Sequence, residues 1–187
     1  KRLPLDTYKK QHRGGQGLLG METKEEERVV DMFVTMTHNV ILFFTDRGRV
    51  YQLKAYRIPV AGRHSKGRPI VNLLPRLEEG ERLEDNISID SFDDGLDLVF
   101  ATRRGTIKRT SLSEYRNIRV NGIIAINLVD GDELVETRVA RPGSEIVLAS
   151  RSGQAARFDV SEVRSVGRAS IGVRGMRLDE GDEVVSM

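Results

Sequence analysis

Glycine recurs in this chain in three series that keep step with one another. The first lies among basic residues at intervals of about fifty residues: Gly17, Gly67, Gly122 and Gly172. The second series lies in turns of the form Thr/Ser-x-x-Gly and consists of Gly48, Gly105 and Gly153. The third lies in acidic turns and consists of Gly80, Gly131 and Gly181. A period of this length is typical of repeat proteins, in which each repeat is one supersecondary unit that packs on its neighbours. The chain is therefore predicted to be an array of similar units.

The residues around the second glycine series have the pattern of a β-hairpin. ILFFT-DRG-RVYQL spans residues 41–53, and its copies LVFAT-RRG-TIKRT and IVLAS-RSG-QAARF span 98–110 and 146–158. In each, two short runs with β-branched or aromatic residues flank a tight turn, with glycine where a positive φ is needed. The second strand alternates in polarity, so one of its faces is expected to be wet and open to charged side chains.

Further strands are expected after each hairpin. A basic glycine loop comes first, then a short apolar run (PIVNLL, GIIAINL or GVRGMRL), then an acidic turn and another strand such as ELVETRV or EVVSM. Pro75 interrupts the best helical candidate, residues 69–83. Four strands in about fifty residues are typical of a propeller blade. The predicted fold class is all-β, a propeller-like array of four-stranded blades in one domain over residues 1–187, with about three and a half repeats present. We expect the chain to be part of a longer polypeptide.

Composition narrows the class of protein. The 187 residues are 39% hydrophobic and 31% charged, as expected of a folded domain. Cysteine is absent, which excludes disulfides and thiolate metal sites and fits a reducing cytosol. No apolar run approaches the eighteen or so residues of a membrane span. The formal net charge is only +2, but basic residues gather before the first-series glycines and acidic residues after them. A nearly neutral chain of this kind can still present a basic surface to a polyanion.

The first repeat contains a denser glycine-rich string, QHRGGQG, at residues 11–17. Its glycines permit unusual backbone angles and remove side-chain bulk, so backbone N–H groups can approach a phosphate. Arg13 adds a forked cation, and Lys9 and Lys10 add charge nearby. On residues alone the string is either a phosphate-binding loop or a tight exposed turn. It does not resemble a Walker loop, because Lys and Ser/Thr do not follow the last glycine.

The string and the repeats together resemble one family, the C-terminal domain of the DNA gyrase A subunit. That family carries a box of the form Gln-basic-Arg-Gly-Gly-basic-Gly and repeats similar to ILFFTDRGRVYQLKAYRIP, ATRRGTIKRT, GIIAINL and GDELV. The resemblance covers the whole chain. It implies a β-pinwheel of six blades whose basic rim wraps duplex DNA, so that the enzyme can introduce negative supercoils. It also implies that the partners are DNA, the B subunit of an A2B2 enzyme, and the rest of the A subunit itself, in the cytoplasm at the nucleoid.

The resemblance implies no catalytic residue, no metal and no cofactor within this domain. ATP and Mg²⁺ would act elsewhere in the enzyme, and the strand-cleaving tyrosine would lie in another domain. His12 and Gln16 depart from the box, since Lys or Arg is usual at both positions, so two phosphate-neutralising charges are missing at neutral pH. The principal DNA anchor is expected at the box, with contacts added from the equivalent loops and hairpins. The predicted DNA-contacting residues are Lys9, Lys10, Gln11, His12, Arg13, Gly14, Gly15, Gln16, Gly17, Arg63, Lys66, Arg68, Arg103, Arg104, Lys108, Arg109, Arg116, Arg119, Arg168 and Arg174.

Two other functions remain open at this point. The first is the corresponding domain of topoisomerase IV, which selects DNA crossovers and has similar blades but a lost or eroded box; the Arg13-Gly14-Gly15 core with Gly17 favours gyrase. The second is a propeller that binds a polypeptide through its acidic turns, for example residues 78–81. A module of this second kind would bind generic duplex DNA weakly and with little dependence on salt.

Overall fold

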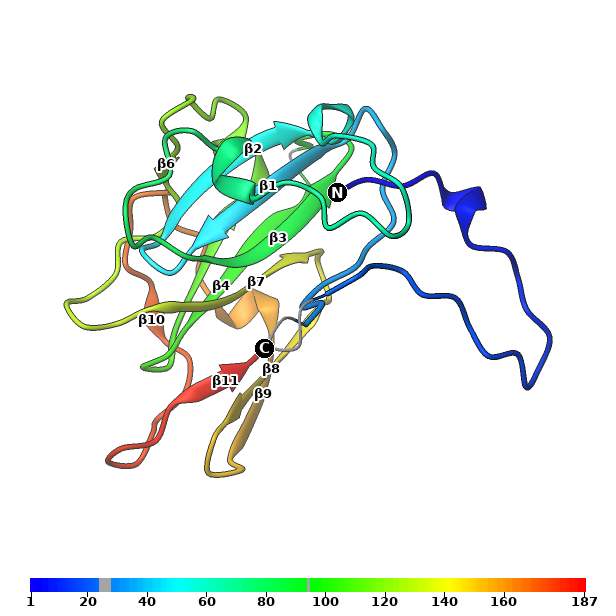
Figure 1. Ribbon diagram of the computed structural model, residues 1–187. Helices are drawn as coiled ribbons and strands as arrows, with labels where there is room; N and C mark the ends of the chain where they lie inside the picture. Colours follow the sequence, from blue (N-terminus) through cyan, green and yellow to red (C-terminus); the bar gives the residue numbers. More distant parts are fainter. Residues whose placement is uncertain (24–27, 94) are drawn as a thin grey trace.

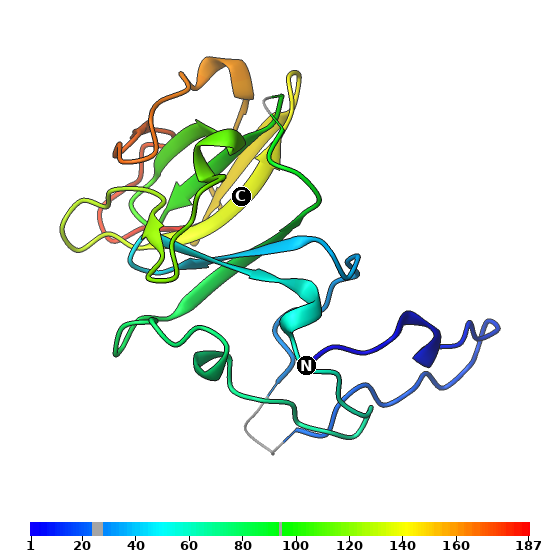
Figure 2. The same ribbon diagram turned by 90° about the horizontal axis from the view of Figure 1, so that it is seen from above.

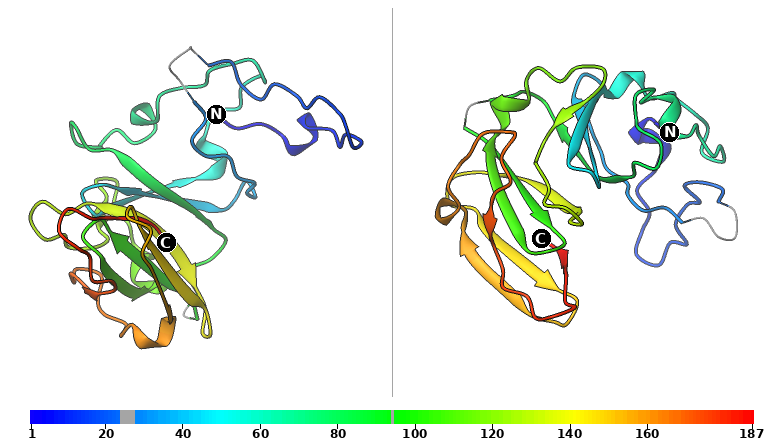
Figure 3. Two further views of the ribbon diagram at one scale, coloured as in Figure 1. Left: turned by 90° about the horizontal axis from the view of Figure 1, so that it is seen from below. Right: turned by 90° about the vertical axis from the view of Figure 1, so that its left-hand side faces the viewer.

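Three antiparallel β-hairpins form the framework of the protein. The computed structural model describes residues 1–23, 28–93 and 95–187. The acidic residues Glu25, Glu26 and Glu27, which follow Gly17 in the sequence, lie outside the described residues. The hairpins fall where the Thr/Ser-x-x-Gly turns predict them, and they follow one another in chain order (Figures 1 and 3). Their strands are β1 (Val40–Thr45) with β2 (Arg49–Lys54), β4 (Asp97–Thr102) with β5 (Thr106–Ser111), and β8 (Glu145–Ser150) with β9 (Ala155–Asp159).

A strand that leaves the acidic turn pairs with the first strand of the hairpin in the same repeat. In the first hairpin this strand is β3 (Leu83–Ile89), which pairs with β1, and in the second it is β7 (Leu134–Ala140), which pairs with β4. In the third it is β11 (Val184–Ser186), which pairs with β8. β7 lies against both β3 and β11, so these strands form the inner edges of the three sheets.

The outer strand of each complete sheet comes from the following repeat. β6 (Ile123–Ile124) pairs with β2, and β10 (Val173–Arg174) pairs with β5. The sheet orders are β3-β1-β2-β6 in blade 1, β10-β5-β4-β7 in blade 2 and β11-β8-β9 in blade 3. The expectation of four-stranded blades is thus correct for the first two sheets. A blade is not one contiguous repeat, however, because each complete sheet contains a strand that belongs to the next repeat.

Short 3₁₀ turns connect the strands where the sequence predicts loops or strands. Residues 69–74, expected as a strand, contain the turn η3 (Ile70–Asn72), since Ile70 and Leu73 pack against the apolar cluster around Tyr51 and Leu53. The remaining 3₁₀ turns are η1 (Leu5–Thr7), η2 (Ala55–Arg57), η4 (Leu112–Tyr115) and η5 (Val160–Glu162). Among the described residues, none of the helical segments has the length and apolar character needed to span a bilayer.

The hydrophobic core lies between neighbouring sheets, as a repeat array requires. Phe44 of blade 1 meets Phe100 of blade 2 edge to face, with ring centroids 5.6 Å apart, and both side chains are fully buried. A second cluster joins Val99 and Ile107 of blade 2 to Leu148 of blade 3. Burial of side chains of this size contributes roughly 1.5–3 kcal/mol each. The blades therefore depend on one another for their stability.

The hairpin glycines allow one blade to receive the chain of the next. The Gly48 carbonyl accepts hydrogen bonds from the Ala125 and Ile126 N–H groups, at 2.8 and 3.1 Å. Gly105 repeats the arrangement with Gly175 and Met176, at 2.8 and 3.2 Å. A Cβ atom at Gly105 would lie only 2.8 Å from the Met176 carbonyl oxygen, and the φ of this residue is +80°. Glycine is thus required there both by the backbone angle and by the close approach of the next repeat.

We predict that Gly105→Ala destabilises the protein more than Gly153→Ala does. Both glycines occupy the same hairpin position with positive φ, but the space around Gly153 is open for 4 Å. Gly153→Ala therefore isolates the cost of the left-handed backbone, roughly 1–2 kcal/mol, whereas Gly105→Ala adds about 1–3 kcal/mol of steric overlap. Urea unfolding of the two variants checks the order. Equal losses in the free energy of unfolding would show that the contact with Met176 does not constrain residue 105.

Candidate nucleic-acid interface

Arginines at the hairpin turns are paired with the acidic turns. Arg47 contacts Glu78 at 3.1 Å, Arg103 contacts Glu133 at 2.7 Å, and Arg151 contacts Glu183. The turns are also joined through the backbone, since the Asp132 carboxylate accepts the Arg104 N–H at 2.9 Å. Positive charge at this end of the blades is thus largely neutralised by carboxylates within the protein.

These ion pairs continue from blade to blade. Arg82 contacts Asp46 of its own blade at 3.4 Å and Glu133 of the next blade at 3.1 Å. Arg103 in turn contacts both Glu133 and, at 3.7 Å, Glu183 of the third blade. At the positions of blade 1 equivalent to Arg103 and Glu133 the signs are reversed, because the hairpin residue is the acid Asp46 and the residue after the acidic turn is the base Arg82. The reversal gives Glu133 a cation on each side.

Arg103, Arg104 and Arg109 have other partners than the predicted DNA. Arg103 forms the ion pairs with Glu133 and Glu183 described above, and the Arg104 guanidinium donates to the Asp130 carbonyl at 3.0 Å. Arg109 forms an ion pair with Asp97 at 2.6 Å and donates to the carbonyls of Val160 and Val163 in blade 3. These three residues hold blades and turns together, so their side chains are already engaged within the protein.

Lys108 corrects the prediction that it contacts DNA. Its side chain is fully buried over the ring of Phe100, and its ammonium donates to the carbonyls of Ala125, at 2.6 Å, and Arg168, at 2.5 Å. Burial, with a smaller effect from the charge of Arg168, lowers the pKa of Lys108 to about 7. The sequence pattern misplaced this residue because its neighbours in the TIKRT strand are polar, although the side chain points into the junction between blades.

The basic glycine loops carry a different kind of cation. The loops at 116–122 and 164–172 run directly into β6 and β10, and they therefore lie at the outer edges of the sheets. In the part of the chain that the structure describes, eight exposed arginines and lysines that lie in or immediately beside the four basic loops make no ion pair. These residues are Lys9, Lys10, Arg13, Lys66, Arg68, Arg119, Arg164 and Arg174. Arg164 was not among the predicted DNA-contacting residues, although its position in the fourth basic loop could have indicated it.

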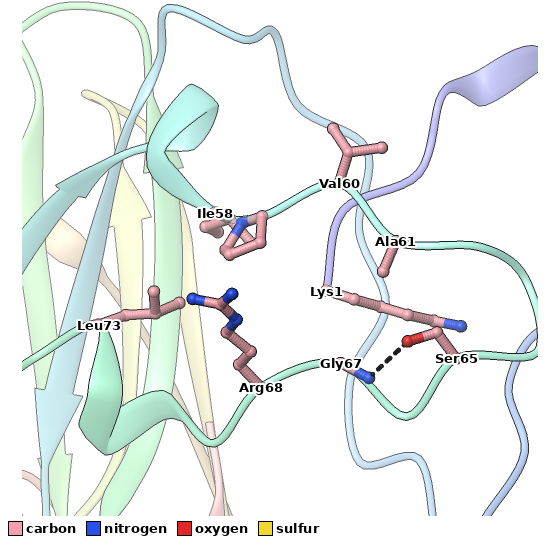
Figure 4. Close-up of a pocket in the computed structure, with 9 residues that line it drawn as sticks. Lys1, Ile58, Val60, Ala61, Ser65, Gly67, Arg68 and Leu73 are labelled. Atoms are coloured by element: carbon pink, nitrogen blue, oxygen red, sulfur yellow. Dashed lines mark hydrogen bonds between the residues drawn. The ribbon is translucent and has the colours of Figure 1, made fainter.

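Other predicted residues of the loops are partly engaged with the protein. Arg168 is half-buried and donates to the Ile124 carbonyl at 2.6 Å, and exposed Arg116 donates to the Phe92 carbonyl at 2.8 Å. Half-buried Arg63 lies beside His64, with nitrogens 3.4 Å apart. Figure 4 shows Arg68 directed toward Ile58 and Leu73 in a pocket near Lys1.

Three of the four loops rest on other parts of the chain. Gly122 lies so close to Tyr51 that a Cβ atom would be 2.8 Å from the ring, and Gly172 lies against the Ile107 carbonyl. Gly67 lies beside Lys1, whose ammonium donates to the Arg63 carbonyl at 2.5 Å. The box loop belongs to the N-terminal segment, which extends away from the sheets (Figures 1 and 2), and residues 9–17 are all exposed.

The fold and the loops define a class of protein, a propeller-type array with unpaired cations in its exposed basic loops. The model of the family described as "DNA gyrase C-terminal domain, beta-propeller" matches residues 1–36, 39–85, 96–141 and 144–187, one match for each repeat. The chain belongs to this family.

Relatives and solved structures agree with this assignment. The chain is 49% identical to the DNA gyrase A subunit of Clostridium acetobutylicum over 94% of its length, and 45% identical to that of Escherichia coli over 98%. It spans about a fifth of the length of these relatives, 21% in each. The fold is similar to a structure of the DNA gyrase A C-terminal domain, with a TM-score of 0.77, 27% identity, and coverage of 100% of this chain and 59% of that one. A crystal structure of the C-terminal domain of DNA topoisomerase IV has the same TM-score, with 32% identity and coverage of 88% and 51%.

The buried lysine predicts a pH dependence of stability. Since the pKa of Lys108 is about 7 in the folded protein and near 10.5 when unfolded, the unfolded chain binds more protons between these values. The free energy of unfolding should therefore rise as the pH rises through this window. Lys108→Met should flatten that rise, whereas Lys54→Met, at an exposed lysine, should not. Urea unfolding between pH about 7 and about 10 checks this; parallel curves for wild type and Lys108→Met would contradict it.

Proposed function

We propose that this chain binds duplex DNA without sequence specificity and bends it along the basic glycine loops. One observation carries the proposal: three arginines of the hairpin turns, Arg47, Arg103 and Arg151, form ion pairs with acids, whereas most cations of the glycine loops are exposed and make no ion pair among the described residues. Unpaired cations can replace the counterions of DNA, and the release of those counterions drives binding. The proposed contacts come from the box loop, residues 11–17, in which Arg13 is the cation, with Lys9, Lys10, Arg63, Lys66, Arg68, Arg116, Arg119, Arg164, Arg168 and Arg174.

Several loops are needed because DNA is stiff. Bending 20–30 base pairs by 40–90° costs roughly 1–6 kcal/mol in elastic estimates. One loop cannot offset this cost, whereas cations on successive blades can follow the backbone around an arc. Arg174 lies in the outer strand β10, and Arg119 lies in the loop that leads to the outer strand β6 of the neighbouring sheet, so both lie where such an arc would pass.

Within the longer polypeptide, the domain would act as the non-catalytic, DNA-wrapping part of gyrase. It would present a wrapped segment to the strand-passing parts of an A2B2 enzyme at the bacterial nucleoid, and ATP and Mg²⁺ would act there and not in this domain. Relatives named as gyrase A subunits and the Arg13-Gly14-Gly15 core of the box support gyrase over topoisomerase IV. The acidic turns make the polypeptide-binding alternative weaker, since the carboxylates of Glu78 and Glu133 already form ion pairs within the protein.

Salt dependence should separate the two kinds of arginine. Arg119→Gln and Arg174→Gln should each lower the magnitude of the slope of log affinity against log salt by about 0.9, because each removes one phosphate contact. Arg103→Gln is the control and should leave the slope unchanged, since its charge is already paired. Titration of a generic duplex of about 150 base pairs at several salt concentrations measures these slopes. An equal effect of all three variants would contradict the proposal.

Replacement of residues 11–17 by alanine in the intact gyrase enzyme should abolish supercoiling. ATP-dependent relaxation should survive, because the strand-passing parts of the enzyme are untouched. Topoisomer distributions on a relaxed plasmid, with and without the replacement, provide the measurement. If supercoiling continued at the wild-type rate, the box would not be the principal anchor.

A further inference from the structure

The box loop obtains its shape from within itself, unlike the other glycine loops. Gly122 and Gly172 lie against the neighbouring blade, and Gly67 lies against the N-terminal residue. By contrast, apart from the adjacent residues, no described atom lies within 4 Å of the place where a Cβ would stand at Gly14 or at Gly17. Both residues have positive φ, +87° and +75°, so the backbone is sharply turned without external support. Some internal contact must hold this turn.

Gln11 supplies that contact. Its side-chain oxygen accepts the N–H of Gly17 at 2.8 Å and so joins the two ends of the seven-residue box. A second bond, from the Gly15 N–H to the His12 carbonyl at 3.0 Å, closes the turn inside this ring. The side chain also explains Gly15, since a Cβ there would lie 2.6 Å from the Gln11 oxygen and 2.9 Å from its Cβ. The Gln11 side chain therefore fills the space that a side chain at residue 15 would need.

We infer that Gln11 is a positioning residue, which orders the box before DNA arrives and makes no phosphate contact that affinity requires. The inference rests on the proposed function for its effect on DNA. A neutral amide cannot release counterions, but a closed loop holds Arg13 and the backbone N–H groups in one arrangement. Without the closure, the loop must lose that conformational freedom on binding, and affinity falls. Gln11 therefore acts through the cations that flank it.

Three substitutions separate positioning from contact, with the full-length polypeptide that contains this chain as the protein. Gln11→Met keeps the length of the side chain but removes the acceptor, and Gln11→Glu keeps the acceptor. Gln16→Met is the matched control, because Gln16 lies in the same loop and has no side-chain hydrogen bond among the described residues. Hydrogen exchange of the Gly17 amide, without DNA, should be fast only in Gln11→Met. Loss of protection in the control, or protection retained in Gln11→Met, would overturn the closure.

Binding to a generic duplex of about 150 base pairs then tests the consequence. Gln11→Met should weaken affinity about tenfold at fixed salt, or about 1.4 kcal/mol, with the salt slope unchanged, whereas Arg13→Ala should reduce the slope by about 0.9. Unchanged affinity, or a slope that falls as far as in Arg13→Ala, would overturn the inference. If the wild-type polypeptide bound duplex DNA without salt dependence, the proposed function would fail, and the exchange experiment would still decide whether Gln11 closes the loop.

Discussion

The exchange of a strand between successive repeats is the interaction on which the rest of the structure depends. The carbonyls of Gly48 and Gly105 receive the chain of the next repeat, and β6 and β10 then pair with the previous hairpin. Each hairpin is too small to bury its own apolar face. Strand exchange places that face against the next sheet, as the contact of Phe44 with Phe100 shows. It also carries the loops at 116–122 and 164–172 to the outer edges of the neighbouring blades.

The same exchange sorts the cations into two groups. The hairpin turn and the acidic turn meet at one end of each blade, so Arg47, Arg103 and Arg151 find carboxylate partners. The loops that cross to the next blade lie against backbone and an aromatic ring instead of acids, which leaves Arg119 and Arg174 without an ion pair among the described residues. A chain with a formal net charge of +2 can thus still present uncompensated positive charge in its exposed basic loops. Buried Lys108 connects the second hairpin to the loop that crosses from the next repeat, because its ammonium donates to the carbonyl of Arg168 in that loop.

Much of the fold could be predicted because the repeats supply their own alignment. The three hairpins and the positive φ of their turn glycines, Gly48, Gly105 and Gly153, follow from the spacing and from the steric limits on other residues. The prediction of the site was less complete. The pattern placed Arg103 and Arg109 with the loop arginines, since both groups lie near a glycine in the sequence. Side-chain partners separate them, and these partners come from other blades, for example Val160 and Val163 for Arg109.

The sequence by itself determined the repeat, the all-β fold class, the positions of the glycines in turns and the family resemblance, because each of these depends on residues close together in the chain. Only the tertiary structure decided which repeat completes which sheet, that Lys108 is buried, and which arginines are neutralised. Those outcomes depend on contacts between residues far apart in the chain. The alternation of polar and apolar residues within one strand does not specify such contacts, since it reports which face is buried but not what lies against it.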